Sequence, residues 1–435
     1  MPEIKSSNPV LALTVLIFGH FLNHFYAYVL AAAMLVIRLP SEMNLTPEQV
    51  GMLSMVQMLV FAVFSLAVGI IGDRWLKSKK VFIPIGVILM AVHLFIASFA
   101  PEGNNGVTLL IIASITVGIG ASFYHPIAYA AIADLYENKK GLTMALNAGL
   151  GMIGTSIAPG LVVTFDRWVG WRTFFIIFGI VGLVLGVLMF FAMNKLIDYQ
   201  FTVKEIKEQE NKKSMTNSNR VSNWFRKEFV VILTFAVIIC LLYSSFRSGI
   251  FKITSQWLSI IFVDLYSIPT FTAGWITVII LVIGGLTAII GGVVSDKFTT
   301  SLTMMISTGG SALILLIIFL LGATIPSFWI ISLYFVFIGF LYFSAAAGTK
   351  YVAENVPQGS RATGISLLFA VPSIIAAIFP WIFGIIFGRA GEIWGIGFLF
   401  ILAVAAMITS VILLVRDIQL GKFRKETKVE HLQNY

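Results

Sequence analysis

Long runs of apolar residues constrain the fold of this chain more than any other feature. A helix of about 20 residues crosses the hydrocarbon core of a bilayer, and most of these runs reach that length. They are continuous and do not alternate polar with apolar residues, which favours helices over a membrane barrel. The runs cover about 10–37, 48–71, 81–100, 107–133, 141–165, 172–193, 229–262, 271–294, 302–322, 326–352, 361–388 and 393–415.

Six runs precede a polar stretch and six follow it, so the sequence predicts an all-α membrane protein with twelve transmembrane helices. Composition excludes the soluble classes, because only 11% of the residues are charged, against about 25% in soluble domains. One cysteine excludes a disulfide scaffold.

The basic residues predict the orientation of the spans. If the N-terminus is cytoplasmic, 23 of the 29 Lys and Arg residues lie on the inner side and 4 on the outer side. Cytoplasmic loops carry this excess in membrane proteins. We therefore interpret the net charge of +9 as a topology signal and not as a sign of nucleic-acid binding. We expect a multi-pass protein of the cytoplasmic (inner) membrane with both termini cytoplasmic and with basic segments near anionic lipids.

An internal repeat divides the chain into two halves. The segment Gly69–Arg74 ends the second run with the pattern Gly-x3-Asp-Arg, and Gly292–Lys297 ends the eighth with Gly-x3-Asp-Lys, 223 residues later. Pro159 and Pro380 correspond with an offset of 221. Parallel repeats of six helices are a known transporter architecture. The predicted parts are an N-terminal six-helix bundle at 1–193, a cytoplasmic basic linker at 194–228, a C-terminal six-helix bundle at 229–415 and a cytoplasmic tail at 416–435.

The residues that carry these patterns also resemble a known family. The stretch Gly69–Lys77 resembles the cytoplasmic loop motif of the major facilitator superfamily, and so does Gly170–Arg172 before a Phe-rich run. Gly19–His24, Leu45–Met52 and Val117–Pro126 are most similar to the fosmidomycin-resistance type. The resemblance implies two bundles that rock around a central cavity lined by the first and seventh spans.

The chain departs from that pattern at two positions. His24 and Ile127 stand where this type tends to carry acidic residues, so proton coupling through carboxylates is not implied. Gly154–Pro159 resembles the fifth-span signature of drug–proton antiporters, with Ala158 in place of a glycine, and points to export.

Three polar residues lie near the middle of the first span. His20, Asn23 and His24 are spaced by three and four residues, so they share one helical face. A histidine at this depth is costly if it faces lipid, and imidazole suits proton exchange because its unperturbed pKa is about 6.5. The face is either a substrate or proton site on a cavity, or a hydrogen-bonded helix–helix contact.

Arg247 is the sharpest functional candidate. It lies within the seventh span, and the repeat offset of 223 matches it to His24. A guanidinium keeps its charge and binds carboxylate or phosphate in a bidentate manner, which predicts an anionic ligand. The alternative is a structural bond to a backbone carbonyl or to Asp264. Lys252 either extends this basic site or snorkels to the outer interface.

Other polar residues on the spans complete the candidate site. His125 precedes Pro126 in the fourth span and is either a cavity residue or a packed histidine beside a proline kink. The remaining candidates for the cavity are Gln57, Tyr124, Asn147, Tyr243 and Tyr342.

No Asp or Glu lies at the centre of any span. Charges at the cytoplasmic ends are expected to form an inner network that closes the outward-facing state, or else are plain topology charges. The expected gating residues are Asp73, Arg74, Asp134, Asp296, Lys297, Glu354 and Arg361. Glycines in the fifth and eighth spans are expected to permit close helix approach, namely Gly149, Gly151, Gly154, Gly284, Gly285, Gly291 and Gly292.

The sequence therefore predicts a monomeric secondary transporter, without cofactor or metal, for a small organic anion or amphiphile. No Walker A motif is present, so ATP is not the expected energy source. Protons are the expected coupling ion with His20, His24 and His125 as carriers, and efflux by an antiporter is favoured over uptake. An uncoupled facilitator or an uptake carrier for an anionic metabolite is the alternative. An intramembrane metal-dependent enzyme is a distant alternative, because a His-Glu-x-x-His motif is absent.

Overall fold

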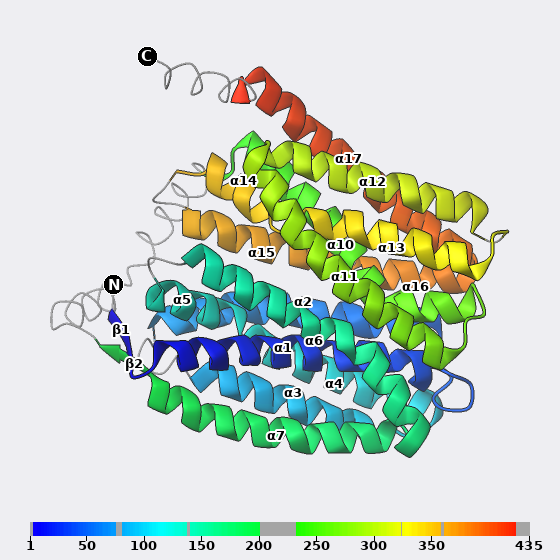
Figure 1. Cartoon of the computed structure of the whole chain (residues 1–435). Helices are drawn as coiled ribbons and strands as arrows, with labels where there is room; N and C mark the ends of the chain where they lie inside the picture. Colours follow the sequence, from blue (N-terminus) through cyan, green and yellow to red (C-terminus); the bar gives the residue numbers. More distant parts are fainter. Residues whose placement is uncertain are drawn as a thin grey trace, which may run out of the picture. The chain divides into compact units, whose positions relative to one another are not determined.

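The computed structural model describes residues 3–74, 81–136, 140–200, 232–322, 324–357 and 361–422 (Figure 1). Among these residues, eleven helices are long and apolar enough to cross a membrane. The shorter apolar helix α3 (Phe82–Ser98) supplies the remaining predicted span. The predicted all-α, multi-pass membrane fold is thus confirmed.

The helices of the first half follow the predicted runs closely. They are α1 (Pro9–Ile37), α2 (Pro47–Arg74), α3, α4 (Val107–Ser122), α5 (His125–Leu135), α6 (Lys140–Val169) and α7 (Trp171–Leu196). A 3₁₀ turn, η2 (Gly103–Gly106), precedes α4. In the described part of the chain the only strands are β1 (Glu3–Ser6) and β2 (Ile197–Gln200), which pair antiparallel with Glu3 opposite Gln200. Most of the predicted linker lies outside the described residues.

The second half repeats this order. Its helices are α10 (Phe235–Asp264), α11 (Thr270–Lys297), α12 (Thr300–Leu321), α13 (Ser327–Phe343), α14 (Ala347–Asn355), α15 (Arg361–Ala377), α16 (Phe379–Arg389) and α17 (Glu392–Gln419). Helices α2 and α11 begin and end 223 residues apart, so the helix boundaries reproduce the offset of the sequence motifs. Helix α17 runs past the predicted end of the last span at 415, and Asp417 near its end is buried.

The chain packs into two compact units. One holds α1 to α7 together with short stretches of α10 and α11, namely Gln256–Ile260 and Pro269–Val278, and the other holds the rest of α10 to α17. Within the first unit α1 packs along α6, and α3 packs along α7. Within the second unit α12 packs along both α17 and α13.

Three predicted spans are not continuous helices. The run at 107–133 divides into α4 and α5, the run at 326–352 into α13 and α14, and the run at 361–388 into α15 and α16. Pro126 and Pro380 stand in the first turns of α5 and α16, where a missing N–H is tolerated. A proline stands at two of the three breaks, and one of them, Pro126, is the proline for which the sequence predicted a kink as one alternative.

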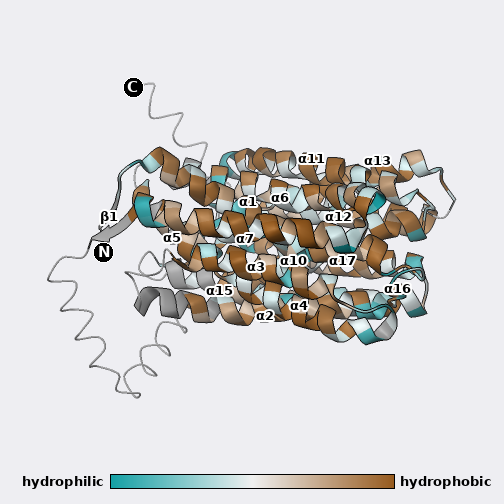
Figure 2. Cartoon of the chain, turned by 90° about the horizontal axis from the view of Figure 1, so that it is seen from below, coloured by the Kyte–Doolittle hydropathy of each residue, from teal (hydrophilic) through white to brown (hydrophobic). Residues whose placement is uncertain are grey.

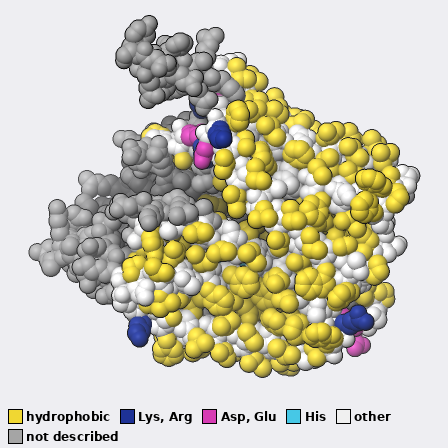
Figure 3. All heavy atoms as spheres, viewed as in Figure 1, with side chains coloured by type: hydrophobic (Ala, Val, Ile, Leu, Met, Phe, Trp, Pro, Cys, Tyr) yellow, Lys and Arg dark blue, Asp and Glu magenta, His cyan; other side chains and the backbone are white. Residues whose placement is uncertain are grey.

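The outer surface is apolar, as a lipid-facing surface must be. Hydrophobic residues dominate the helices, and hydrophilic residues are concentrated toward helix ends and loops (Figure 2). Hydrophobic side chains also predominate on the face drawn in Figure 3, where charged side chains appear in few places. Large exposed side chains such as Leu188, Ile289 and Leu320 belong to these surfaces. Soluble monomers rarely expose apolar patches of this extent.

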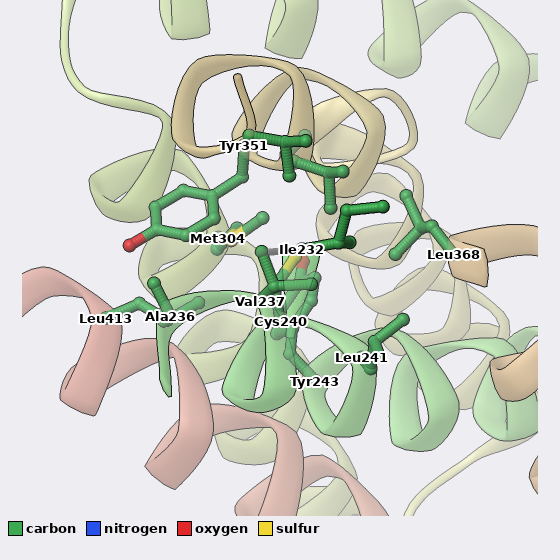
Figure 4. Close-up of a cluster of buried hydrophobic side chains, with 13 residues drawn as sticks. Ile232, Ala236, Val237, Cys240, Leu241, Tyr243, Met304, Tyr351, Leu368 and Leu413 are labelled. Atoms are coloured by element: carbon green, nitrogen blue, oxygen red, sulfur yellow. The ribbon is translucent and has the colours of Figure 1, made fainter. Parts of the chain in front are cut away.

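A buried cluster fixes the start of α10 in the second unit (Figure 4). Cys240 and Tyr243 of α10 pack there with Met304 of α12, Tyr351 of α14 and Leu413 of α17. Full burial of an apolar side chain of this size stabilises the fold by about 1.5–3 kcal/mol. Because Tyr243 is one helical turn before Arg247, this cluster also holds the turn that carries the guanidinium.

Only some of the predicted glycines mediate close helix contact. A Cβ on Gly154 would meet the backbone oxygen of Phe21 on α1, and a Cβ on Gly291 would meet the backbone oxygen of Phe343 on α13. A Cβ on Gly284 would fall 2.5 Å from Ile338, and one on Gly151 would meet the ring of His20. The expectation is wrong for three glycines that have open space beside them, namely Gly149, Gly285 and Gly292.

Candidate substrate and ion sites

His20 lies buried in the first unit at the contact between α1 and α6. Its side chain is 2% exposed, and its Nδ1 is 2.6 Å from the backbone oxygen of Asn147. A carbonyl can only accept a hydrogen bond, so Nδ1 carries the proton. The ring stacks on Tyr124 with centroids 4.7 Å apart and planes 8° apart. The neutral ring therefore has its lone pair on Nε2, which has no hydrogen-bond partner among the described residues.

His24 and His125 complete a cluster of three imidazoles with His20. Their ring centroids lie 4.7 Å apart for His20 and His24, 5.1 Å for His20 and His125, and 5.7 Å for His24 and His125. His24 Nδ1 is 3.0 Å from the hydroxyl of Thr155 on α6. His125 is the first residue of α5, directly after the helix break. The structure thus brings the three predicted histidines together within one unit.

The amides predicted for this site bond to the backbone and to Tyr124. The Tyr124 hydroxyl is 2.7 Å from the oxygen of Leu16 and 2.8 Å from Oδ1 of Asn147. Asn23 Nδ2 donates to the oxygen of Ala121 at 3.0 Å. Gln57 Nε2 donates to the oxygen of Ala27 at 2.6 Å, which ties α2 to α1. These bonds position the helices around the imidazoles.

Arg247 lies near the middle of α10 in the second unit and is half-buried. Its Nε donates to the Ser344 hydroxyl at 3.0 Å, and its Nη2 donates to the oxygen of Leu341 at 2.8 Å. The predicted structural bond to a backbone carbonyl is therefore present. In the described part of the chain, no carboxylate lies within ion-pair distance of this guanidinium.

A chain of hydroxyls holds one edge of the Arg247 guanidinium. Ser344 Oγ accepts from the Tyr243 hydroxyl at 2.7 Å and from Arg247 Nε, and it donates to Ser307 Oγ at 2.8 Å. Ser307 in turn donates to the oxygen of Phe340 at 2.6 Å. Both acceptor positions and the single proton of Ser344 are used, so the direction of every bond in the chain is fixed.

A cavity of about 150 Å³ opens beside Arg247 within the second unit. Hydroxyls from three helices reach it, in contrast to the apolar spans around it. Its lining consists of Tyr243, Ser244, Arg247, Ser248, Ser344, Ala345, Gly348, Thr349, Leu368, Phe369, Pro372 and Ser373. One cation among several hydroxyl donors is a suitable environment for an oxyanion.

Two predicted residues of the second unit do not line this cavity. The Tyr342 ring is buried against Phe251, with centroids 5.3 Å apart. Lys252 Nζ lies 6.0 Å from the Phe251 ring centroid. Both side chains lie beside Phe251.

The break between α4 and α5 and the break between α13 and α14 are stabilised by similar hydrogen bonds. At the end of α13 the N–H of Ala345 bonds to the oxygen of Tyr342, which leaves the oxygen of Leu341 for Arg247. At the end of α4 the oxygen of Ala121 accepts from Asn23. In both units a side chain of the first helix therefore bonds to a carbonyl near the break, as buried backbone groups require.

The expected gating charges are only partly described. Asp296 pairs with Lys350 of α14 at 2.7 Å, a partner that the sequence did not indicate. Both oxygens of Glu354 are 3.1 Å from the Thr300 hydroxyl, and Lys297 is exposed. The side chains of four further predicted gating residues lie outside the described set, namely Asp73, Arg74, Asp134 and Arg361.

Two units of membrane-length apolar helices, each with buried polar residues within its first helix, are typical of a polytopic membrane protein of the transporter class. The chain belongs to the Major Facilitator Superfamily, which it matches over residues 16–345. The family and the curated relatives that it matches are transporters and not enzymes.

Curated relatives agree with this assignment. The chain is 29% identical over 163 residues to the sphingosine-1-phosphate transporter SPNS2 of Danio rerio, covering 36% of this chain and 31% of the relative. It is 24% identical over 177 residues to a probable L-galactonate transporter of Escherichia coli (strain K12), and the match covers 40% of this chain and 37% of the relative. A probable sulfoacetate transporter, SauU of Cupriavidus necator, is 26% identical over 194 residues, covering 43% of each. The chain therefore spans less than half the length of these relatives.

Solved structures share the fold. A bacterial homolog of the human lysosomal transporter Spinster, inward-facing and unoccupied, superposes with a TM-score of 0.72 at 16% identity, covering 93% of this chain and 98% of that one. A POT family transporter in complex with 5-aminolevulinic acid superposes with a TM-score of 0.70 at 15% identity. The match covers 93% of this chain and 95% of that one.

Proposed function

We propose that this protein is a secondary transporter that carries a small organic anion or anionic amphiphile by alternating access, with Arg247 binding the anionic group. The observation that carries the proposal is a permanent cation on α10 that faces a cavity lined by hydroxyls and has no carboxylate partner among the described residues. A partly buried cation without a counter-ion costs free energy of desolvation, and an anionic ligand offsets that cost.

The relatives support an anionic substrate. Sphingosine 1-phosphate, galactonate and sulfoacetate, which the names of the three curated relatives give as their substrates, all carry an acidic group. The cavity of about 150 Å³ suits one such group rather than a whole amphiphile. Phosphate, sulfonate and carboxylate all accept two parallel hydrogen bonds from a guanidinium.

The proposal includes proton coupling and efflux from the cytoplasm. Because no Asp or Glu lies at mid-span, we assign the proton-carrying role to the imidazoles of His20, His24 and His125. The protein is proposed to act as a monomer in the cytoplasmic membrane with both termini inside, as the distribution of basic residues favours. The narrower likeness to the fosmidomycin-resistance type remains a prediction from sequence.

Arg247→Ala tests the anion site. In proteoliposomes, counterflow of galactonate, sulfoacetate and a lysophospholipid is measured for the wild type, Arg247→Ala and Arg247→Lys. At least one anion should show saturable counterflow that Arg247→Ala abolishes and Arg247→Lys weakens, since lysine keeps the charge but loses the bidentate geometry. Lys252→Ala removes a charge from the same helix outside the cavity and should have a smaller effect. Equal counterflow by Arg247→Ala and the wild type would contradict the proposal.

A further inference from the structure

We propose that His20, His24 and His125 form a binding site for a divalent transition metal of the zinc class. Each histidine offers one ring nitrogen, and the three nitrogens all lie within 4.8 Å of one another. All three residues belong to the first unit, so the site is complete within it. The inference does not depend on the anion site at Arg247, and it assigns the three imidazoles a role as ligands in place of the proton coupling proposed above.

The arrangement of the rings fits a metal better than a simple stack. Three imidazoles around one tetrahedral ion, with metal–nitrogen bonds of about 2.0 Å, place their ring centroids about 5 Å apart. The observed separations are 4.7, 5.1 and 5.7 Å. The planes of His20 and His125 are 86° apart and those of His24 and His125 are 81° apart, so these pairs meet edge to face. The nitrogens, now within 4.8 Å of one another, must approach to roughly 3.3 Å to share one ion.

The partners of the rings are those that metal-binding histidines use. A ligating imidazole generally donates its other N–H to a carbonyl, a carboxylate or a similar group, which fixes the tautomer. His20 Nδ1 donates to the oxygen of Asn147, which leaves the lone pair on Nε2, and that atom has no hydrogen-bond partner among the described residues. The Thr155 hydroxyl lies 3.0 Å from Nδ1 of His24, so it can orient this ring through that nitrogen.

The donor set selects the class of ion. Neutral imidazoles suit zinc, copper and nickel, whereas Mg²⁺ and Ca²⁺ require oxygen ligands. Three histidines leave a fourth coordination position for water or another oxygen ligand. A bound ion would join α1 to the first residue of α5, which directly follows the break between α4 and α5.

Metal titration of the purified protein tests the proposal. The protein is purified with an affinity tag that contains no histidine, and it carries the substitution His431→Ala. Neither the tag nor the tail then contributes a ligand. Calorimetry should show one Zn²⁺ per chain and no Mg²⁺, and Co²⁺ should give the visible absorption of a tetrahedral site. Affinity for Zn²⁺ should fall at least about tenfold in His24→Asn and in His125→Asn. His93→Asn, which removes a buried histidine of α3 outside the cluster, should leave it unchanged.

A second variant separates coordination from misfolding. Thr155→Val removes only the group that orients His24 and should weaken Zn²⁺ binding about tenfold, whereas Thr155→Ser should restore it. X-ray absorption of the wild-type zinc complex should show three imidazole ligands, which requires no variant. Absence of saturable one-to-one Zn²⁺ binding would overturn the proposal. Unchanged Zn²⁺ affinity in His24→Asn and His125→Asn would also overturn it, as would an X-ray absorption spectrum without imidazole ligands. The cluster would then be a packing contact or a proton site.

Discussion

Replacing Ser344 by alanine tests the hydrogen-bond arrangement that holds Arg247. The Ser344 hydroxyl is 1% exposed and is the acceptor of two buried donors, the Tyr243 hydroxyl and Arg247 Nε. Ser344→Ala leaves both donors without this acceptor, whereas Ser307 keeps its bond to Phe340. Each buried donor left unsatisfied costs about 1–3 kcal/mol, and the cost is higher for a charged donor. Water can enter the adjacent cavity and reach Arg247, so we expect the free energy of unfolding to fall by about 2–4 kcal/mol in total.

Ser311→Ala is the matched control for this substitution. Ser311 is an equally buried serine on α12, but its hydroxyl bonds to the oxygen of Ser307 within its own helix. Its loss should cost less than about 1 kcal/mol. The assay is denaturant unfolding in detergent, combined with anion binding to the folded variants. Anion affinity should also fall in Ser344→Ala, because the guanidinium loses one of its two fixed contacts. Equal stability of Ser344→Ala and Ser311→Ala would refute the reasoning.

Two further substitutions, each with a matched control, test contacts within single units. Gly154→Ala places a Cβ against the backbone oxygen of Phe21, which cannot move away, and should lower the free energy of unfolding by about 1–3 kcal/mol. Gly149→Ala in the same helix meets no neighbour and should be neutral or stabilise by up to about 1 kcal/mol, so equal effects in thermal unfolding would contradict the packing of α1 on α6. The buried carboxylate of Asp417 accepts from the Ser301 hydroxyl and pairs with Lys422. Asp417→Ala should lower the free energy of unfolding by about 3 kcal/mol or more in the same assay. Asp296→Ala, which removes an exposed ion pair, should cost less than about 1 kcal/mol, and a similar loss for the two would refute the role assigned to burial.

The spans and the repeat were predictable because the bilayer imposes them on the sequence. A helix in lipid must be apolar over its whole length, so the runs mark the spans directly. Pro126 gave a signal for the break between α4 and α5. The break between α13 and α14 had no such signal, because Ser344, Ala345 and Ala346 are all compatible with a helix. Its cause is tertiary, since Arg247 binds the oxygen of Leu341.

The histidines, the arginine and the amides of the candidate sites were predictable from the sequence, whereas the hydroxyl groups that hold them were not. A histidine or arginine at mid-span is conspicuous because it is costly in lipid. Thr155 and Ser344 gave no signal, because hydroxyls are common in membrane helices and often bond to their own backbone, as Ser311 does. Whether a hydroxyl bonds within its helix or reaches a neighbouring side chain depends on helix packing, which the apolar pattern does not specify.

The similar bonds at the two broken helices limit which side chains the first helix of each unit can carry there. The carbonyls of Ala121 and Leu341 can only accept, so the side chain beside each break must be a hydrogen-bond donor. Asn23 meets this need with an amide and Arg247 with a guanidinium, although the offset of 223 matches Arg247 to His24 and not to Asn23. An ionised Asp or Glu has no proton to donate at either position. The two units thus satisfy the same requirement from neighbouring but non-equivalent positions, and with different charge.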